Sequence, residues 1–356
     1  MPIKINETRL FSYIEQLVSL HAPSGYETEV DLMVKDIING SGNEYVQDSA
    51  GNIIVKIPGN NSDHPIAIIS HKDEISLMVK RVEENGNIRV VPVGGLHPWA
   101  IGETPVELLT DNSIVRGVLS IGAKHVSNES PAGDLKEGKG LSWDRMWVDC
   151  KLSTTELSQR GIGPGTRVVI ARHRKKTWEM EKYICGYNLD CRAGLAIIFE
   201  VAQQLLLDGP RQDVYLIASE REEIGGHGAS FALATLPVET AIAVDIAPVS
   251  PEYGTKNNDK PILIEKDSRG VYHVSTNRHL RTLAQKEGFG VQNAVVTSYG
   301  SDSSIAQAGG HVGRSALVGY PGDNTHGYEI CSKEAIVNSA RLITAFAQDP
   351  LGNTIN

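Results

Sequence analysis

The sequence has few cysteines, no apolar run of membrane length and no secretory signal pattern. Its cysteines show no CxxC or metal-finger spacing, which argues against a structural zinc finger. They are Cys150, Cys185, Cys191 and Cys331. No apolar run reaches the roughly 20 residues that a membrane-spanning helix needs, and the first residues lack the apolar core and cleavage site of a signal peptide. We therefore expect a cytoplasmic protein with reduced thiols and no membrane partner.

The sequence also lacks an excess of basic residues. It contains 34 Lys plus Arg against 43 Asp plus Glu, a formal net charge of −9. Nucleic acids bind basic surfaces, so we expect no nucleic-acid partner. The chain has 356 residues, of which 40% are hydrophobic, and can therefore bury a large core. At about 150 residues per domain, this length suggests two domains.

Two kinds of local pattern divide the chain. In residues 1–74 and 173–356, helical periodicity alternates with continuous apolar runs, which are typical of strands buried on both faces of a sheet. The clearest runs are 65–70, 213–218 and 240–244. Residues 75–172 instead show short β-like pieces and turns. We predict an α/β fold with a doubly wound, mixed sheet as the catalytic domain, and a small β-barrel-like domain inserted at 75–172.

Potential metal ligands follow four of the predicted strands or precede a predicted helix. In open α/β sheets, binding sites form outside the carboxyl ends of the strands. The residues that the sequence places along this edge are His71, Asp190, Glu222, Glu223, Asp245 and His326. Several carboxylates that converge in a cleft repel one another unless cations neutralise them. The pattern therefore predicts a metal site.

The types of ligand indicate the kind of metal site. A mixed set of imidazoles and carboxylates suits zinc, cobalt or manganese. A single catalytic zinc keeps an open position beside three protein ligands. Even if only one of the two adjacent glutamates binds metal, the remaining five ligands are too many for one ion. They fit two ions roughly 3.5–4 Å apart that share a bridging carboxylate. Such a pair polarises a carbonyl group and generates a nucleophile from water near neutral pH.

Glu222, Glu223 and Asp73 suggest a division of labour. Neighbouring residues outside a helix point in different directions, so one glutamate can bind metal while the other serves as a general base. Asp73 follows His71 by two residues and can orient its ring through the second nitrogen. Each residue also has a structural explanation, because the glutamate pair can begin a helix and Asp190 can cap one. Their coincidence at consecutive strand ends favours the metal site.

These residues lie in motifs that resemble a known family, the tetrahedral metalloaminopeptidases. This group includes glutamyl, lysyl and deblocking aminopeptidases, and the resemblance covers nearly the whole chain. The motifs that carry it are Pro23-Ser24-Gly25-Tyr26-Glu27, Asp48-Ser49-Ala50-Gly51-Asn52, His71-Lys72-Asp73-Glu74-Ile75, Gly161-Ile162-Gly163-Pro164-Gly165, Leu189-Asp190-Cys191-Arg192-Ala193-Gly194, Glu222-Glu223-Ile224-Gly225, Asp245 and Thr325-His326-Gly327-Tyr328-Glu329.

The resemblance implies a zinc-exopeptidase-like fold and a role for each site residue. Asp190 would bridge two metal ions, zinc or cobalt. His71 and Asp245 would complete one site, and Glu223 and His326 the other. Glu222 would be the general base and Asp73 would orient His71. The resemblance also implies that the β domain serves dimerisation and assembly, with dimers forming a hollow homododecamer that admits peptides.

Among the departures from the family pattern, which also include Ser76 and Gly226-His227, two concern residues directly beside expected ligands. The family usually has a second aspartate where this chain has Cys191, and a hydrophobic residue where it has Lys72. Neither change removes an expected ligand. Lys72 adds a cation beside His71 that either favours an anionic substrate group or pairs with an acid.

We therefore predict a two-metal aminopeptidase in which a bridging hydroxide attacks the peptide carbonyl and Glu222 acts as general base. Two alternatives remain open at this point. One is a metal-dependent amidohydrolase or deacylase that acts on a small metabolite or carbohydrate derivative. The other is a non-catalytic oligomeric binding protein that retains the fold. The sequence leaves the preferred N-terminal residue and the physiological metal undetermined.

Overall fold

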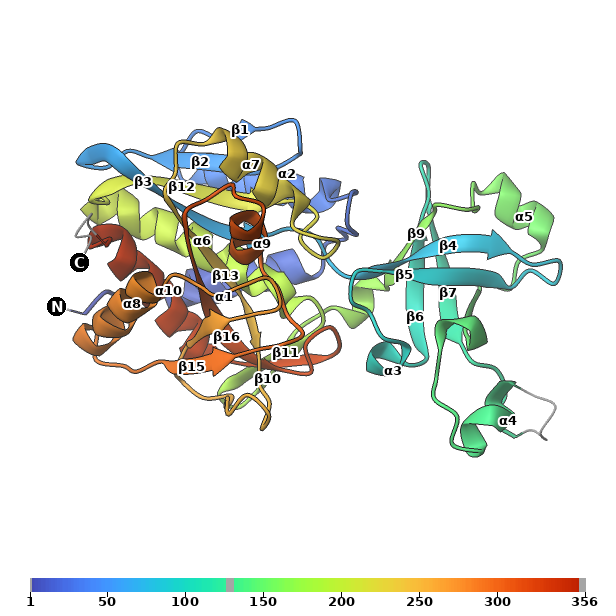
Figure 1. The fold of residues 1–356 in the computed structure, drawn as a ribbon. Helices are drawn as coiled ribbons and strands as arrows, with labels where there is room; N and C mark the ends of the chain where they lie inside the picture. The colour runs from blue at the N-terminus through green and yellow to red at the C-terminus, as the bar shows by residue number, and fades with distance from the viewer. Residues whose placement is uncertain (1, 126–130, 352–356) are drawn as a thin grey trace.

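The computed structural model describes residues 2–125 and 131–351. Residues 126–130, in the predicted insertion, and residues 1 and 352–356, in the predicted catalytic part, lie outside the described residues. The described chain forms a large mixed sheet covered by helices, and a closed barrel that projects to one side of it (Figure 1). This arrangement confirms the predicted α/β fold class with its inserted barrel.

The large sheet combines a parallel centre with antiparallel flanks. Its main path runs β1-β2-β12-β3-β13-β16-β17-β11-β10, and β14 pairs with both β16 and β15. The central strands β12, β3, β13 and β16 are parallel to their neighbours in this group. The bounds are β1 (Val46–Gln47), β2 (Ile53–Ile57), β3 (Asn61–His71), β10 (Trp178–Met180), β11 (Tyr183–Gly186), β12 (Gln212–Ser219), β13 (Thr240–Pro248), β14 (Ile262–Lys266), β15 (Gln292–Val295), β16 (Arg314–Asp323) and β17 (Glu329–Ser332).

Helices cover both faces of this sheet, which explains why its central strands are continuous apolar runs. One face packs against α1 (Glu7–Val18), α2 (Thr28–Gly40), α6 (Leu189–Asp208), α8 (Val274–Lys286) and α10 (Lys333–Gln348). The other face packs against α7 (His227–Thr235) and α9 (Asp302–Ala308). None of the described helices combines the length and apolarity needed to cross a membrane.

The barrel closes in the order β4-β5-β8-β7-β6-β9 around its own apolar core. Its elements are β4 (Ser76–Val82), β5 (Ile88–Val93), α3 (Pro98–Ile101), β6 (Thr104–Leu109), β7 (Ile114–Ser120), α4 (Pro131–Lys136), β8 (Trp147–Asp149), α5 (Thr154–Gln159) and β9 (Arg167–Ile170). Strand β4 was not predicted from the sequence. This strand follows the His71 motif with no intervening Gly or Pro, and it contains the charged pair Lys80-Arg81, so its apolar pattern is short.

The register of the central strands determines which side chains meet at the edge. Ser219 of β12 pairs with His71 of β3, and Ala243 of β13 pairs with Ile69. Asp245 therefore lies level with His71, two residues farther along the neighbouring strand. Because the strands are parallel, their carboxyl ends open at the same edge of the sheet.

Candidate metal centre

One group of potential ligands lies at the end of β3, within β13 and at the start of α6. The Nε2 atom of His71 is 3.0 Å from Oδ1 of Asp190 and 3.8 Å from Oδ1 of Asp245. Ligand atoms of these three residues and of Cys191 all lie within 4.8 Å of one another, and all four residues are buried. We call His71, Asp245 and Cys191 the sheet group. The strand ladder itself fixes the positions of His71 and Asp245.

A second group lies on the loops that follow β12 and β16. The Nε2 atom of His326 is 3.5 Å from Oε2 of Glu223 and 3.5 Å from Oδ2 of Asp190. We call Glu223 and His326 the loop group. Asp190 stands between the groups, with Oδ1 facing His71 and Oδ2 facing His326. The structure thus places one carboxylate between two clusters of ligand atoms.

Asp190 is held at the start of α6 by irregular backbone. The preceding Asn188 has φ +64°, and Asp190 and Cys191 have non-helical dihedral angles within α6. The amide N–H of Asp190 donates to Oε2 of Glu329, at 3.1 Å. This buried contact joins the N-terminal end of α6 to β17, and it fixes the backbone from which the Asp190 carboxylate extends.

Burial and neighbouring negative charges make three of the carboxylates, Glu222, Glu223 and Asp245, hard to ionise without a cation. Burial, and then the charge of Asp190, raise the pKa of Asp245 to about 7. Burial raises the pKa of Glu223 to about 8, and the pKa of Glu222 lies well above its ordinary value for the same reason. The negative charge of Glu223 raises the pKa of His326 to about 9. A site of this kind is suited to bind positive charge.

Asp73 contacts residues of both groups: His71 in the sheet group and Glu223 in the loop group. Its Oδ1 lies 3.4 Å from Nδ1 of His71, and its backbone carbonyl lies 3.1 Å from the same nitrogen. Its carboxylate also accepts the amide N–H groups of Glu222 and Glu223, at 2.9 and 3.2 Å. Strand β3 ends at His71, so Asp73 reaches these partners from the connection to the barrel rather than from a continuing strand.

With this geometry in place, comparison with known proteins identifies the family. The M42 glutamyl aminopeptidase family matches residues 51–342, most of the chain. The chain belongs to this family. It is therefore a peptidase of a metal-dependent family, and the structure contains two clusters of residues that could hold metal ions. The predicted resemblance is confirmed.

Similar proteins include curated aminopeptidases and solved structures with the same fold. A putative aminopeptidase of Bacillus subtilis is 26% identical over 95% of this chain and 97% of its own length. Lysyl aminopeptidase of Pyrococcus furiosus is 29% identical over 74% of this chain and 73% of its own length. In structure, the TET1 peptidase of Pyrococcus horikoshii covers 96% of this chain and 99% of its own, with a TM-score of 0.85 and 23% identity. That peptidase can assemble into a tetrahedron or a large octahedral shell.

The two residues that the sequence led us to expect as departures from the family pattern, Lys72 and Cys191, lie in different surroundings. Lys72 is fully buried and donates to a carboxylate oxygen of Asp31 and to the carbonyl of Gly51. It therefore pairs with an acid, which is one of the two alternatives that the sequence left open. Cys191 lies within the sheet group, where its thiol donates to the carbonyl of Val244, at 3.2 Å. Burial raises its pKa well above the ordinary value, which keeps the sulfur protonated in this environment.

The M42 site contains acids that the sequence analysis did not single out. Glu329 appeared there only as part of the His326 motif, although it holds the Asp190 amide. Asp302, at the start of α9, accepts a hydrogen bond from Ser219 and is 2% exposed. Burial raises the pKa of Asp302 to about 6. Asp302 lies in a Gly-Ser-Asp-Ser-Ser segment, which is typical of a helix start. This local pattern does not predict that Asp302 lies near the site.

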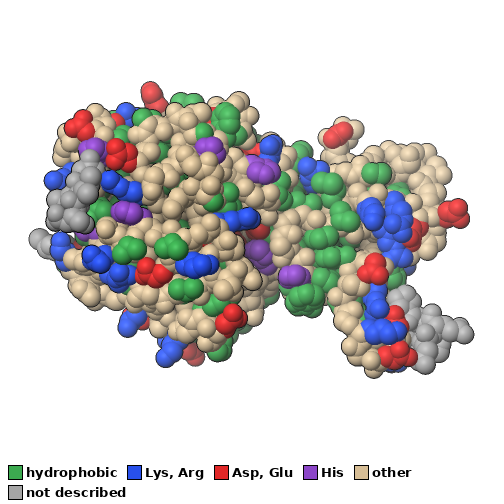
Figure 2. Space-filling view, viewed as in Figure 1, with side chains coloured by type: hydrophobic (Ala, Val, Ile, Leu, Met, Phe, Trp, Pro, Cys, Tyr) green, Lys and Arg blue, Asp and Glu red, His purple; other side chains and the backbone are tan. Residues whose placement is uncertain are grey.

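The M42 site opens into a hollow at the junction of the body and the barrel. The hollow has a volume of about 770 Å³, including space open to solvent, and Glu222 lines it together with Asp190, Asp245, Glu223 and His326. Other lining residues are Gly95, Ser268, Arg269, Tyr299 and Ile305. Figure 2 shows histidine and hydrophobic side chains gathered where the barrel meets the body. The hollow therefore leaves part of the candidate site open to solvent.

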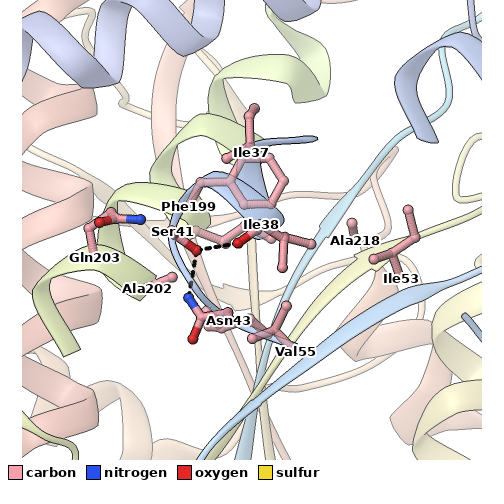
Figure 3. Close-up of a pocket in the computed structure, with 12 residues that line it drawn as sticks. Ile37, Ile38, Ser41, Asn43, Ile53, Val55, Phe199, Ala202, Gln203 and Ala218 are labelled. Atoms are coloured by element: carbon pink, nitrogen blue, oxygen red, sulfur yellow. Dashed lines mark hydrogen bonds between the residues drawn. The ribbon is translucent and has the colours of Figure 1, made fainter. Parts of the chain in front are cut away.

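A second, smaller cavity lies elsewhere in the M42 body, between α2, α6 and β2 (Figure 3). Ile37, Val55 and Phe199 are among the apolar side chains that line it. Its polar contacts are internal, since Ser41 donates to the carbonyl of Ile38 and accepts from Asn43. No acidic residue or histidine is among the described residues that line this cavity, so it offers no metal ligands. The candidate ligands border the hollow at the junction instead.

Proposed function

We propose that this chain is an aminopeptidase that uses two divalent metal ions to remove residues from the N-terminus of peptides. The observation that carries the proposal is the position of Asp190, whose two oxygens face two separate ligand groups. The buried, unpartnered Oε1 of Glu223 supports it, because the described residues offer this acidic oxygen no hydrogen-bond donor. Leaving a buried polar atom without a partner costs free energy, and a bound cation beside this oxygen would remove that cost.

The residues fit two ions of intermediate hardness. His71 and Asp245 would hold one ion, Glu223 and His326 the other, and Asp190 would touch both. Each site then combines imidazole nitrogen with carboxylate oxygen, a donor set that suits zinc or cobalt better than magnesium or calcium. Cys191 is left outside this set, because its thiol is already engaged with Ser70 and Val244.

Side chains of the protein would transfer the protons during the reaction. When bound, the two ions polarise the scissile carbonyl and lower the pKa of water. Glu222 borders the hollow, which Asp245, Glu223 and His326 also line. Its carboxylate would accept the proton of the attacking water and donate it to the leaving amine nitrogen. Asp73 would keep Glu222 in place through the amide N–H of that residue.

The same proposal includes self-assembly. The barrel presents exposed apolar side chains, among them Ile114 and Val118 on β7 and Trp99 on α3. With the likeness to the TET1 peptidase, this supports residues 75–172 as an assembly domain, with dimers building a dodecamer around a chamber that admits peptides. A cytoplasmic location fits the four free thiols.

Replacing Glu222 by Gln tests the assignment of the base. Glu222→Gln should lower kcat on aminoacyl substrates by about 10²–10⁴-fold, because the amide cannot accept the proton. Two metal ions per chain should remain, as measured by elemental analysis. Glu252→Gln is a matched control on the surface and should leave both values unchanged. Full activity in Glu222→Gln would disprove this role.

A substrate panel separates the alternatives. Cleavage of peptides with a free amino terminus, and not of N-acylated amino acids, supports the aminopeptidase. The reverse preference would indicate a deacylase. Absence of hydrolysis after loading with zinc or cobalt would indicate a binding protein.

A further inference from the structure

One turn of the barrel reaches into the candidate metal centre. It consists of Gly94 and Gly95, which lie between β5 and α3. The carbonyl oxygen of Gly95 is 3.1 Å from Nδ1 of His326. A carbonyl can only accept a hydrogen bond, so Nδ1 carries the proton. That leaves Nε2, which faces Asp190 and Glu223, as the nitrogen available to a metal ion.

The same turn approaches both residues of the loop group so closely that side chains do not fit. A Cβ atom at Gly95 would lie 2.9 Å from Cε1 and Nδ1 of His326. A Cβ at Gly94 would lie 3.3 Å from Cβ and Oε2 of Glu223, and the φ of +87° at Gly94 disfavours other residues as well. The two glycines therefore allow the barrel backbone to pack directly against the loop group.

His326 depends on this contact more than His71 depends on the barrel. Asp73, two residues along the chain, orients the ring of His71, and His71 is 2% exposed at the end of a central strand. His326 lies on a loop with φ +61°, and its side chain is 34% exposed. A non-glycine residue in the left-handed region is held there by its surroundings. The Gly95 carbonyl is part of those surroundings.

A buried polar network holds the barrel at this position. We call it the junction network; it consists of His21, Glu74, Glu107, Lys175 and Asn188. Lys175 is fully buried, and its ammonium donates to both oxygens of Glu74, at 2.8 and 2.6 Å, and to Nδ1 of His21, at 3.0 Å. Nε2 of His21 then donates to Oε2 of Glu107 on barrel strand β6, at 2.7 Å.

The network also touches the site from the body. Oε2 of Glu74 accepts from the amide of Asn188, at 2.8 Å, two residues before Asp190. The ammonium group of Lys175 makes three hydrogen bonds within the network, so each of its three N–H donors has a partner. Breaking such a buried, satisfied pair is costly, so the network holds barrel and body in one relative position.

We infer that the inserted barrel is a positioning element of the catalytic site: the Gly94–Gly95 turn orients His326 and confines Glu223, and the junction network keeps that turn in place. The inference rests on the proposed function in assuming that the loop group binds a metal ion. It assigns to the barrel a role within each subunit, separate from assembly.

Gly95→Ala tests the inference. The added methyl group collides with the His326 ring, so the second ion should bind about 10–100-fold more weakly while the first keeps its affinity. Titration of the metal-free protein with zinc, followed by calorimetry, measures both affinities. At limiting zinc, kcat should fall with little change in KM, and excess zinc should restore it. Gly140→Ala lies in the same insertion with open space around it and should match the wild type.

A second variant tests the positioning role of the barrel without altering the Gly94–Gly95 turn. Glu107→Gln keeps the shape of the side chain but weakens the barrel end of the junction network. It should weaken the second ion and leave the first unchanged. Thermal unfolding of each variant shows whether the fold is kept. Two ions bound with wild-type affinities in both variants would overturn the inference. A wild type that binds two ions yet cleaves no peptide would refute the proposed function alone.

Discussion

The sheet group and the loop group share Asp190 but are built in different ways. His71 and Asp245 are 2% and 5% exposed, and both lie on neighbouring parallel strands whose register fixes their separation. Glu223 and His326 lie on loops, and the His326 side chain is 34% exposed. One half of the site is thus a product of the sheet, and the other half is held by contacts between distant segments.

This difference suggests different tasks for the two halves. A buried ligand pair on a strand ladder needs little reorganisation when an ion binds. A loop pair that borders the open hollow can respond to substrate and depends on its neighbours for orientation. Functional residues often lie on loops that a rigid scaffold positions. Here the scaffold includes the barrel as well as the sheet.

The largest expected effect comes from removing what the two halves share. Asp190→Asn keeps the shape of the side chain but removes the charge that both groups face. Both ions should bind more weakly by more than the roughly 100-fold that loss of an outer partner costs, and peptidase activity should be lost with them. Elemental analysis after dialysis measures this, with Asp208→Asn at the far end of α6 as control. Loss of one ion alone would show that Asp190 serves a single half.

A smaller and more selective effect is expected at Asp73. Asp73→Asn weakens the interaction that orients His71, so the ion of the sheet group should lose about 10–100-fold in affinity. The amide oxygen still accepts one of the two N–H groups from Glu222 and Glu223, so the loop group should be affected less. Zinc titration resolves the two affinities. An equal loss at both sites would erase the distinction between the halves.

The smallest effect concerns the unmodified protein. Because the loop group is more exposed and is held by loops, a chelator should remove its ion first. We expect the two affinities to differ by about tenfold, equivalent to about 1.4 kcal/mol. Stepwise chelation of the cobalt-loaded protein, followed by its visible absorption, reports the order of release. Simultaneous release would contradict the comparison.

Local sequence patterns predicted much of this structure. The apolar runs that became β3, β12 and β13 predicted the centre of the sheet, and the polar residues that follow these runs were the candidate ligands. The pattern was weaker for short strands such as β4, where charged residues interrupt it. Glu329 could be found from its place three residues after His326, but its contact with the Asp190 amide depends on how β17 packs against α6.

The sequence alone determined the chemistry of the centre, because strand ends in a parallel sheet open at one edge and the residues there are imidazoles and carboxylates. Tertiary structure decided which neighbours orient them. Lys72 turned toward Asp31, Asp302 came to lie beside Ser219, and a glycine turn of the barrel reached His326. Hydrophobic periodicity is local and can be identified along the chain, whereas these contacts join segments whose proximity depends on how the sheet, the helices and the barrel pack together.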